Sequence, residues 1–501
     1  MIWYNTRMRN RSAFFPLRWV SIVFLMLAVI LTAVELVSYS RIRSNYPPGM
    51  VIAGIQVGGL DPQQANERLL QAYTAVPVEV HYRDAVIQIK PSLVDFKLEM
   101  EPMMAAADQE RLRQPVWTGF WDFLWNRFPK PTPVPLISTL SETRLRAFLA
   151  NEVAVRYDLP PSPSMPVPGS TGFQAGQTGT LLDINRAVVL VSDAFRSPGD
   201  RSVVFSFNRV APPRPSIENL KILLQQIITS AKYEGTLELY LSDLQTGDEI
   251  HFAYDKAQLV KPDLVFTAAS TMKIPIMISV FKKITGPLPA NLSDLITLMT
   301  EYSENGPADT LMQQVLDKSL GPLQVTEDMK TLGLDNTFLA GYFYPGAPLL
   351  QRFKTPANQR TDVPTDPDAY NQTTPAEMGM LLGDIYTCAE KDGGTFRAVF
   401  GNWITQDECK QMIAFLSKNH NGVLLEAGLP EGTRIAHKHG WIIENDNLMH
   451  SISDAGIIYS PGGNYILSIY LHDGKQLLFD PANIMVGNLS QAVYNYYNFS
   501  E

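Results

Sequence analysis

The stretch "FTAASTMKIPIMISVF", residues 266–281, decides how the rest of the chain is interpreted. It is mostly apolar and predicts the start of a buried helix. Ser270 and Lys273 stand three residues apart, so a helix would place both side chains on one face. A buried lysine loses part of its preference for the charged form and can take a proton from a neighbouring hydroxyl. The stretch therefore predicts Ser270 as a nucleophile and Lys273 as its general base, although this spacing alone is common in long chains.

A second candidate segment is "TEYSENGPADTL", residues 300–311, which lies between two predicted helices. A loop at such a place can direct side chains into a cleft. The hydroxyl of Ser303 could relay a proton to a leaving group, and the amide of Asn305 could hold a substrate carbonyl. Taken alone, a capping serine and a turn asparagine would explain the segment better.

A third candidate segment is "AHKHGWI", residues 436–442, inside a run that predicts a strand. Gly440 would allow another backbone or a ligand to approach closely. Lys438 would attract a substrate carboxylate. An edge-strand lysine beside a bulge is the structural alternative.

In this order, the three segments resemble the signature of the serine penicillin-recognising enzymes, which include class A β-lactamases and D-alanyl-D-alanine peptidases. The resemblance covers about residues 217–501 and implies acylation of a serine by a β-lactam or a cell-wall peptide amide. It also implies an oxyanion hole built from the backbone N–H groups of Ser270 and Trp441. The roles it implies are catalytic for Ser270, Lys273 and Ser303, and substrate-binding for Asn305, Lys438, His439, Gly440 and Trp441.

The sequence departs from that family in ways that bear on turnover. The second motif is S-E-N rather than S-D-N, and His439 replaces the usual hydroxyl residue. Class A β-lactamases use a glutamate before the "TTP" helix for deacylation, but no glutamate occurs between Glu327 and Glu377. We expect an acyl-enzyme that hydrolyses slowly; the alternative is a catalytically degenerate protein that binds peptidoglycan. The aspartates of this region have no matching context: Asp362, Asp366 and Asp368.

The pattern of segments over residues 217–501 predicts an α+β domain. Strand-like runs stand near both ends of this range, and the middle is mostly helical. Such an order implies an antiparallel sheet closed by its termini, flanked by helices and with a helical subdomain inserted. This is the fold that the resemblance implies as well.

Residues 49–210 predict a separate, smaller α+β domain. Asp61 followed by Pro62 is typical of a helix start. The segments "AGIQVGGLDPQQA" and "GQTGTLLDINRAV" resemble a family of extracytoplasmic domains associated with peptidoglycan binding. A stalk that binds nothing specific is the alternative. The proline-rich "APPRPS", residues 211–216, predicts the linker to the second domain.

The N-terminus predicts a membrane anchor over residues 19–38, because an apolar stretch of about twenty residues can cross a bilayer as a helix. Residues 1–18 are basic, and the positive-inside rule therefore keeps them in the cytoplasm and sends both domains outside. A cleaved signal peptide is the alternative, but no clear cleavage site precedes Tyr46. We expect a single-pass protein of the cell membrane.

Composition excludes some functions and leaves one question open. The net charge is −9 and no long basic run follows the N-terminus, so nucleic acid is not an expected partner. No Cys/His cluster predicts a metal, and we expect no cofactor. Cys388 and Cys409 lie in two predicted helices, where a disulfide and two separate buried thiols are equally compatible with the sequence.

Overall fold

A computed structural model describes residues 15–499, with side chains from residue 18 onward, and it divides the chain into two compact units. The first unit is Met1–Pro161 with Thr178–Ala211, and the second is Ser162–Gln177 with Pro212–Glu501. Most of the predicted basic segment 1–18, including three of its arginines, lies outside the described residues.

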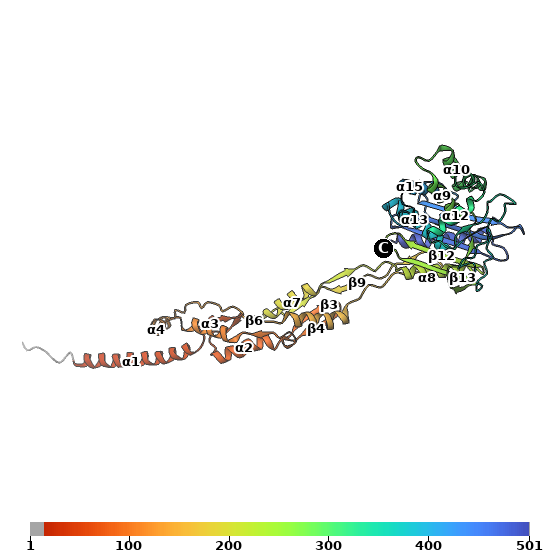
Figure 1. Cartoon of the computed structure of the whole chain (residues 1–501). Coiled ribbons are helices and arrows are strands. Elements are labelled where there is room, and N and C mark those ends of the chain that lie inside the picture. Colours follow the sequence, from red (N-terminus) through yellow and green to blue (C-terminus); the bar gives the residue numbers. More distant parts are fainter. Residues whose placement is uncertain (1–14, 500–501) are drawn as a thin grey trace, which may run out of the picture. The chain divides into compact units, whose positions relative to one another are not determined.

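The first unit begins with the long helix α1 (Phe15–Ser44), which is shown at the red end of the chain in Figure 1. Its stretch Arg18–Ser44 is long and apolar enough to cross a membrane by length and composition, a test that a signal sequence would also pass. The apolar side chains from Trp19 to Val34 are exposed. In aqueous solution this apolar surface would be in contact with water, which is unfavourable.

The globular part of the first unit packs helices around a small sheet. Asp61 caps α2 as expected, because its Oδ1 accepts the Gln64 N–H at 2.8 Å. Strand β10 pairs parallel to β3, and β4 pairs antiparallel to β3. The main elements are α2 (Pro62–Thr74), β3 (Val78–Tyr82), β4 (Ala85–Ile89), α3 (Met100–Leu112), α4 (Val116–Leu124), α5 (Glu142–Phe148), β9 (Gly179–Leu182), α7 (Ile184–Arg196), β10 (Ser202–Val204) and β11 (Phe207–Val210).

The predicted continuous domain 49–210 differs from the structure in one place. Residues Ser162–Gln177 form the hairpin β7 (Met165–Pro166) and β8 (Phe173–Gln174), which belongs to the second unit. The Phe173 ring lies 6.2 Å from that of Tyr496, near the end of the chain. An apolar contact across more than 300 residues leaves no local signal in the sequence, so the prediction missed it.

The second unit is built on a six-stranded antiparallel sheet in the order β14-β13-β12-β20-β19-β18. The first long strand, β12, pairs with the last, β20, so the termini close the sheet and the predicted α+β fold is confirmed. The strands are β12 (Thr236–Asp243), β13 (Glu249–Asp255), β14 (Gln258–Val260), β18 (Arg434–Ile443), β19 (Met449–Ser460) and β20 (Gly463–His472).

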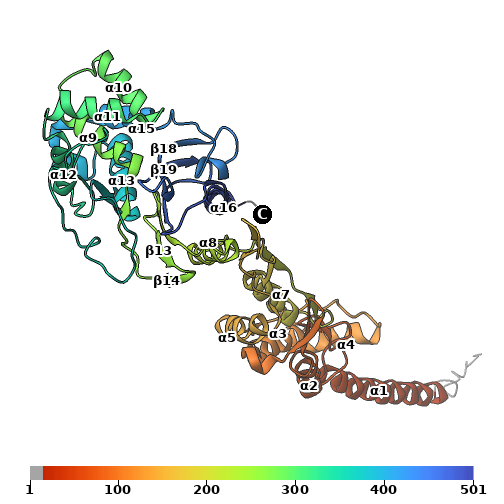
Figure 2. The same cartoon turned by 90° about the vertical axis from the view of Figure 1, so that its right-hand side faces the viewer.

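Helices cover both faces of this sheet (Figure 2). Side chains alternate along a strand, so β19 sends Ile457 to one core and Ile458 to the other. One face packs on α8 (Ile217–Ala231) and α16 (Phe479–Tyr497), and the other on α9 (Lys273–Lys283), α13 (Pro375–Lys391) and α15 (Gln406–Leu416). The inserted helices are α10 (Ala290–Thr300), α11 (Asn305–Leu311) and α12 (Gly321–Thr331).

The two cysteines form a disulfide that joins α13 to α15. The Cα atoms of Cys388 and Cys409 are 6.0 Å apart, and both residues are fully buried. The question left open by the sequence is thus answered in favour of a bond.

Candidate active site

Ser270 lies in a single 3-10 turn, Ala269–Met272, that leads directly into α9. Strand β15 (Phe266–Thr267) holds the chain just before this turn by pairing with β17 (Asn371–Thr373). Ala269 has φ +48°, a left-handed conformation that is costly for a residue with a Cβ. The strained turn gives Ser270 a fixed position at the start of the helix.

The ammonium group of Lys273 connects the first two predicted segments. Its Nζ lies 2.9 Å from Ser270 Oγ and 2.9 Å from Asn305 Oδ1. It also donates to the backbone oxygen of Ser303 at 2.6 Å and lies 3.3 Å from Ser303 Oγ. Four residues that are up to 35 positions apart in the chain thus meet at one nitrogen.

The surroundings of Lys273 favour its neutral form. The side chain is fully buried. This burial, and next the nearby Lys438 cation, lower the pKa of Lys273 to about 7, against the opposing effect of Asp309 and Glu304. A lysine with such a pKa is neutral in a large fraction of molecules at neutral pH and can act as a base.

Lys438 lies on β18 and is also fully buried. Its Nζ donates to the backbone oxygen of His439 at 3.0 Å. Burial lowers the pKa of Lys438 to about 8, and the Asp454 carboxylate opposes this. Gly440, two residues further along β18, lies directly against the Ser270 backbone, so the third predicted segment reaches the same site as the first.

Gly440 allows β18 to lie directly against the turn that carries Ser270. A Cβ at this position would stand 2.9 Å from the backbone nitrogen of Ser270 and 3.1 Å from the carbonyl oxygen of Ala268. These are backbone atoms that cannot move aside easily. The next residue, Trp441, is partly exposed, at 37% of its surface.

The His439 imidazole is turned away from solvent. Its ring stacks on that of Trp441 with centroids 4.5 Å apart, and Nδ1 lies 3.2 Å from Asn419 Nδ2. Burial, and next the Lys438 cation, lower the pKa of His439 to about 3, so the ring is neutral at pH 7. Only 3% of the residue is exposed. It therefore supports Trp441 and the strand in this structure rather than presenting a donor to solvent.

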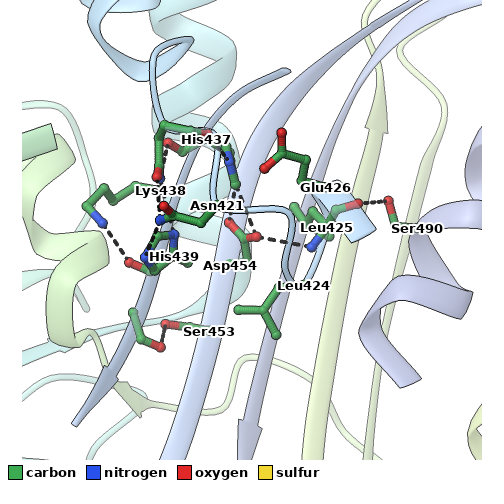
Figure 3. A network of polar contacts seen from close by, with 12 residues as sticks. Asn421, Leu424, Leu425, Glu426, His437, Lys438, His439, Ser453, Asp454 and Ser490 are labelled. Atoms are coloured by element: carbon green, nitrogen blue, oxygen red, sulfur yellow. Dashed lines mark hydrogen bonds and ion pairs between the residues drawn. The ribbon is translucent and has the colours of Figure 1, made fainter. Parts of the chain in front are cut away.

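A buried ion pair next to Lys438 was not predicted from the sequence. His437 Nδ1 lies 2.9 Å from Asp454 Oδ1 (Figure 3). Its Nε2 lies 2.9 Å from the Asn419 backbone oxygen. Both ring nitrogens face acceptors, so both must donate and the ring is an imidazolium. Burial acts against this charge, but Asp454 raises the pKa of His437, and His437 in turn lowers that of Asp454.

This pair fixes the strand that carries Lys438. The Leu425 N–H donates to Asp454 Oδ2 at 3.1 Å, which connects the pair to the loop before β18. Figure 3 shows the side chains of His437 and Lys438 leaving the strand in different directions, as alternation requires. The only feature of the sequence that could have indicated this ion pair is the presence of His437 and His439 on either side of Lys438.

Two of the aspartates in the region expected to supply the deacylating residue, and the nearby Glu377, make other contacts. Glu377 accepts from Asn336 N at 2.9 Å and from Thr337 Oγ1 at 2.6 Å, which ties α13 to the preceding chain. Asp362 pairs with Arg360 at 2.6 Å. Asp368 accepts from the Tyr370 N–H at 3.0 Å. Among the described residues, Asp366 makes no hydrogen bond or ion pair with the residues of this site.

One group of potential metal ligands lies outside the site. Oxygen and nitrogen atoms of Glu238, His251 and Asp263 come within 4.8 Å of one another. The Glu238 carboxylate already accepts from His251 Nε2 at 2.8 Å and from the Leu264 N–H at 2.7 Å. These hydrogen bonds join Glu238 to His251 and to the backbone.

Comparison with known proteins places this site in a family. A search of curated proteins finds no match. Similar solved structures include a mutant of PBP-A as an acyl-enzyme complex with penicillin G (20% identity, 57% of this chain and 99% of that chain, TM-score 0.40). Others are an ancestral class A β-lactamase (20%, 55% and 98%, TM-score 0.38) and a β-lactamase from Sphaerobacter thermophilus DSM 20745 (19%, 56% and 98%, TM-score 0.39).

The profile of the family described as "Beta-lactamase enzyme family" matches residues 219–287 and 285–497. These ranges take in more than half of the chain and contain the Ser270 turn, the Ser303 loop and strand β18. The chain belongs to the β-lactamase enzyme family.

Proposed function

We propose that this protein is a membrane-anchored, extracytoplasmic serine hydrolase that is acylated at Ser270 by a β-lactam or by an amide of a cell-wall peptide. The observation that carries the proposal is the position of Lys273 Nζ, buried and 2.9 Å from Ser270 Oγ. A hydroxyl needs a base within hydrogen-bond reach to become a nucleophile, and the pKa of about 7 makes this lysine such a base.

Acylation follows from this geometry. Neutral Lys273 takes the proton of the Ser270 hydroxyl as Oγ attacks the substrate carbonyl, and a C–O bond forms. When the tetrahedral intermediate collapses, the C–N bond breaks, and the leaving nitrogen receives a proton. Ser303 Oγ, 3.3 Å from Lys273 Nζ, is placed to pass that proton from the lysine to the nitrogen.

Two backbone N–H groups would stabilise the developing oxyanion, those of Ser270 and Trp441. The close approach at Gly440 supports this role, because it brings β18 against the Ser270 backbone. Removing one donor of this kind typically costs roughly 3–4 kcal/mol of barrier stabilisation.

Substrate recognition would use Lys438 and Asn305. The family role of Lys438 is to attract the substrate carboxylate, and its burial strengthens such an interaction. Asn305 is oriented by the hydrogen bond from Lys273, so its amide nitrogen is free to point to a substrate carbonyl. Gly440 and Trp441 would line the same side of the substrate, with His439 beneath the indole.

Deacylation would be slow. Glu377, Asp362 and Asp368 are engaged in other hydrogen bonds, which supports the expectation that no carboxylate takes the role of the class A glutamate. A long-lived acyl-enzyme is the property of a penicillin-binding protein rather than of an efficient β-lactamase.

The extracytoplasmic location draws support from two features. Helix α1 has the length and the exposed apolar surface of a membrane span. The Cys388–Cys409 disulfide is of the kind that persists in oxidising compartments.

The direct test is labelling of the full-length protein with a fluorescent penicillin. We expect one equivalent of label on the wild type and none on Ser270→Ala, while Ser319→Ala, a change at an exposed serine, should label normally. Equal labelling of wild type and Ser270→Ala would refute the proposal. Timing the loss of the adduct by mass spectrometry then separates the two enzyme types, since a lactamase clears it in seconds.

A second candidate is a non-catalytic peptidoglycan-binding protein. The observation that favours it is the burial of the His439 imidazole where the family has a substrate-contacting hydroxyl. The first unit, which resembles peptidoglycan-associated domains, would then carry the binding. Hydrolysis of nitrocefin or of a D-Ala-D-Ala peptide that is lost in Lys273→Ala would exclude this candidate.

A further inference from the structure

Helix α4 carries a row of exposed tryptophans. Trp117, Trp121 and Trp125 are 66%, 59% and 68% exposed. They follow one another at intervals of four, so they share one face of the helix and its end. Three large aromatic side chains in water on one face are costly, and an exposed patch of this kind marks a binding surface.

The opposite face of α4 packs on helix α1. The Tyr39 ring lies 5.7 Å from that of Phe120 and 5.6 Å from that of Phe123. A Cβ at Gly119 would stand 2.2 Å from the Tyr39 hydroxyl, so glycine is what lets α4 come this close. Arg43 adds a hydrogen bond to the Gln114 backbone oxygen at 3.1 Å.

These contacts define the level of α4 along α1. Tyr39 is the first residue after the predicted span 19–38, and a span of that length crosses the hydrocarbon core of a bilayer. The next residues on α1 include Arg41 and Arg43, which would lie among headgroups. In a protein anchored by α1, helix α4 would therefore lie at the depth where the hydrocarbon gives way to the polar surface.

Charged side chains gather where α4 meets α1, beside Gly119. A pocket beside α4 is lined by four arginines together with Glu110. Arg113 pairs with Glu110 at 2.9 Å, and Gln114 donates to the one acid on α4, Asp122, at 3.0 Å. Arg111 also pairs with Asp108 at 3.1 Å. The pocket lining itself holds more cations than acids, and phosphate groups would be partners for them. The lining arginines are Arg43, Arg111, Arg113 and Arg127.

We infer that α4 is an interfacial helix that lies in the headgroup region of the membrane entered by α1, with Trp117, Trp121 and Trp125 inserted between phospholipids. Tryptophan prefers this zone, because its ring is apolar and its N–H can still reach a polar partner. The ligand is the phospholipid surface itself. The inference rests on the proposed anchoring by α1 and adds a second, peripheral attachment that holds the first unit at the bilayer.

The test uses the full-length chain in vesicles of phosphatidylglycerol and phosphatidylcholine, with and without bromine on the acyl chains. The protein has seven tryptophans. In each of three variants, Trp→Phe changes remove all of them except those at one chosen place, whose fluorescence is then measured. One variant keeps Trp117, Trp121 and Trp125, one keeps Trp19 alone, and one keeps Trp403 alone. Trp403 is the matched control, since it is 61% exposed and lies in the second unit.

We expect brominated lipid to quench the α4 reporter and the Trp19 reporter by about half or more, and to leave Trp403 unchanged. Quenching of Trp19 without quenching of the α4 reporter would overturn the inference while the anchor stands. Absence of quenching at Trp19 would refute the anchoring itself, and the inference with it.

A second measurement uses the wild-type protein with all of its tryptophans, so its result does not depend on whether the Trp→Phe variants fold correctly. Amide hydrogen exchange over residues 115–128 should be slower in vesicles than in detergent for the wild type, and this difference should be lost in Trp117→Ser/Trp121→Ser/Trp125→Ser. Equal exchange of wild type and variant in vesicles would count against membrane contact.

Discussion

At the scale of single residues, the protonation of Lys273 should make the rate of acylation depend on pH. Its folded pKa of about 7 lies well below the usual value for lysine, and in the proposed reaction the neutral form is the base. The acylation rate should therefore rise with pH through a midpoint near 7. Stopped-flow labelling with a fluorescent penicillin between pH 5 and 9 measures this profile.

A substitution of Lys438 tests whether Lys273 is the group that sets this pH profile. Because its charge helps to lower the pKa of Lys273, Lys438→Met should move the midpoint of the profile to higher pH, whatever it does to the maximal rate. A midpoint that stays in place, or moves down, would mean that another group sets the profile.

The buried pair of His437 and Asp454 allows a second prediction. Asp454→Asn leaves an imidazolium without its partner, so it should lower the free energy of unfolding of the second unit by about 3–5 kcal/mol. Asp446→Asn is the matched control, since Asp446 pairs with His450 at 2.8 Å but is 51% exposed on its side chain. That change should cost far less than Asp454→Asn, because solvent screens an exposed pair. Denaturant unfolding followed by circular dichroism compares the two.

The pair also has a pH window of its own. The pKa of His437 is raised, so its contribution is complete below the unfolded value of about 6.5 and is lost as pH rises through the folded pKa. The pKa of Asp454 is lowered, so its contribution is complete above about 3.9 and is lost as pH falls through the folded pKa. Equal stability losses in the two variants at pH 5–6 would contradict the assigned ion pair.

At the scale of elements, strand β18 depends on Gly440. A methyl group there would meet the Ser270 backbone, so Gly440→Ala should push the strand away from the nucleophile and slow acylation by roughly 100-fold or more. Gly474→Ala is the matched control, because nothing lies within 4 Å of a Cβ at that position. Labelling rates of the two folded variants, checked by circular dichroism, decide the point, and equal rates would disprove the contact.

The link between α13 and α15 gives the fourth prediction. The disulfide closes a loop with a sequence separation of 21. Cys388→Ala/Cys409→Ala should therefore lower the free energy of unfolding by about 3 kcal/mol. Both residues are buried in the core next to α9, so the labelling of Ser270 should change little at temperatures where the variant stays folded. Unchanged unfolding of the variant, or of the wild type after reduction, would show that the bond adds no stability.

The sequence predicted the elements that have a local signal. Helix α9, the Ser303 loop and β18 stand where the patterns of apolar residues placed them, because periodicity and turn residues act over a few positions. Their convergence at Lys273 was anticipated only through the order of three motifs. The His437–Asp454 pair and the burial of His439 were missed, since each depends on which residues face one another across β18 and β19.

At the scale of the whole molecule, the hairpin of residues 162–177 gives the fifth prediction. Phe173 packs against Tyr496 and Phe499 of the C-terminal segment, with ring centroids 6.2 and 6.3 Å apart. Phe173→Ala should cost about 3 kcal/mol in the free energy of unfolding of the second unit, because a partly buried ring is removed. Calorimetry of the full chain should show a lower transition for that unit only.

A fragment that begins at residue 212 lacks this hairpin and should be destabilised at least as much as the Phe173→Ala variant. A fragment as stable as the second unit of the intact chain would mean that the hairpin contributes nothing. The predicted domain limits had no means of including it, because the contact joins residues on both sides of the linker.

If α1 anchors the protein in a membrane as proposed, this hairpin affects how the second unit could be released from it. A peptidase that cuts the chain within residues 211–216 breaks the covalent link between α1 and residues 217–501. Thr171 would still donate to Gln491, and Asn495 would still donate to the Thr171 carbonyl. The two fragments would therefore remain associated through the hairpin after the cut. Release of the C-terminal fragment would require a second step in which the hairpin dissociates from the C-terminal helix.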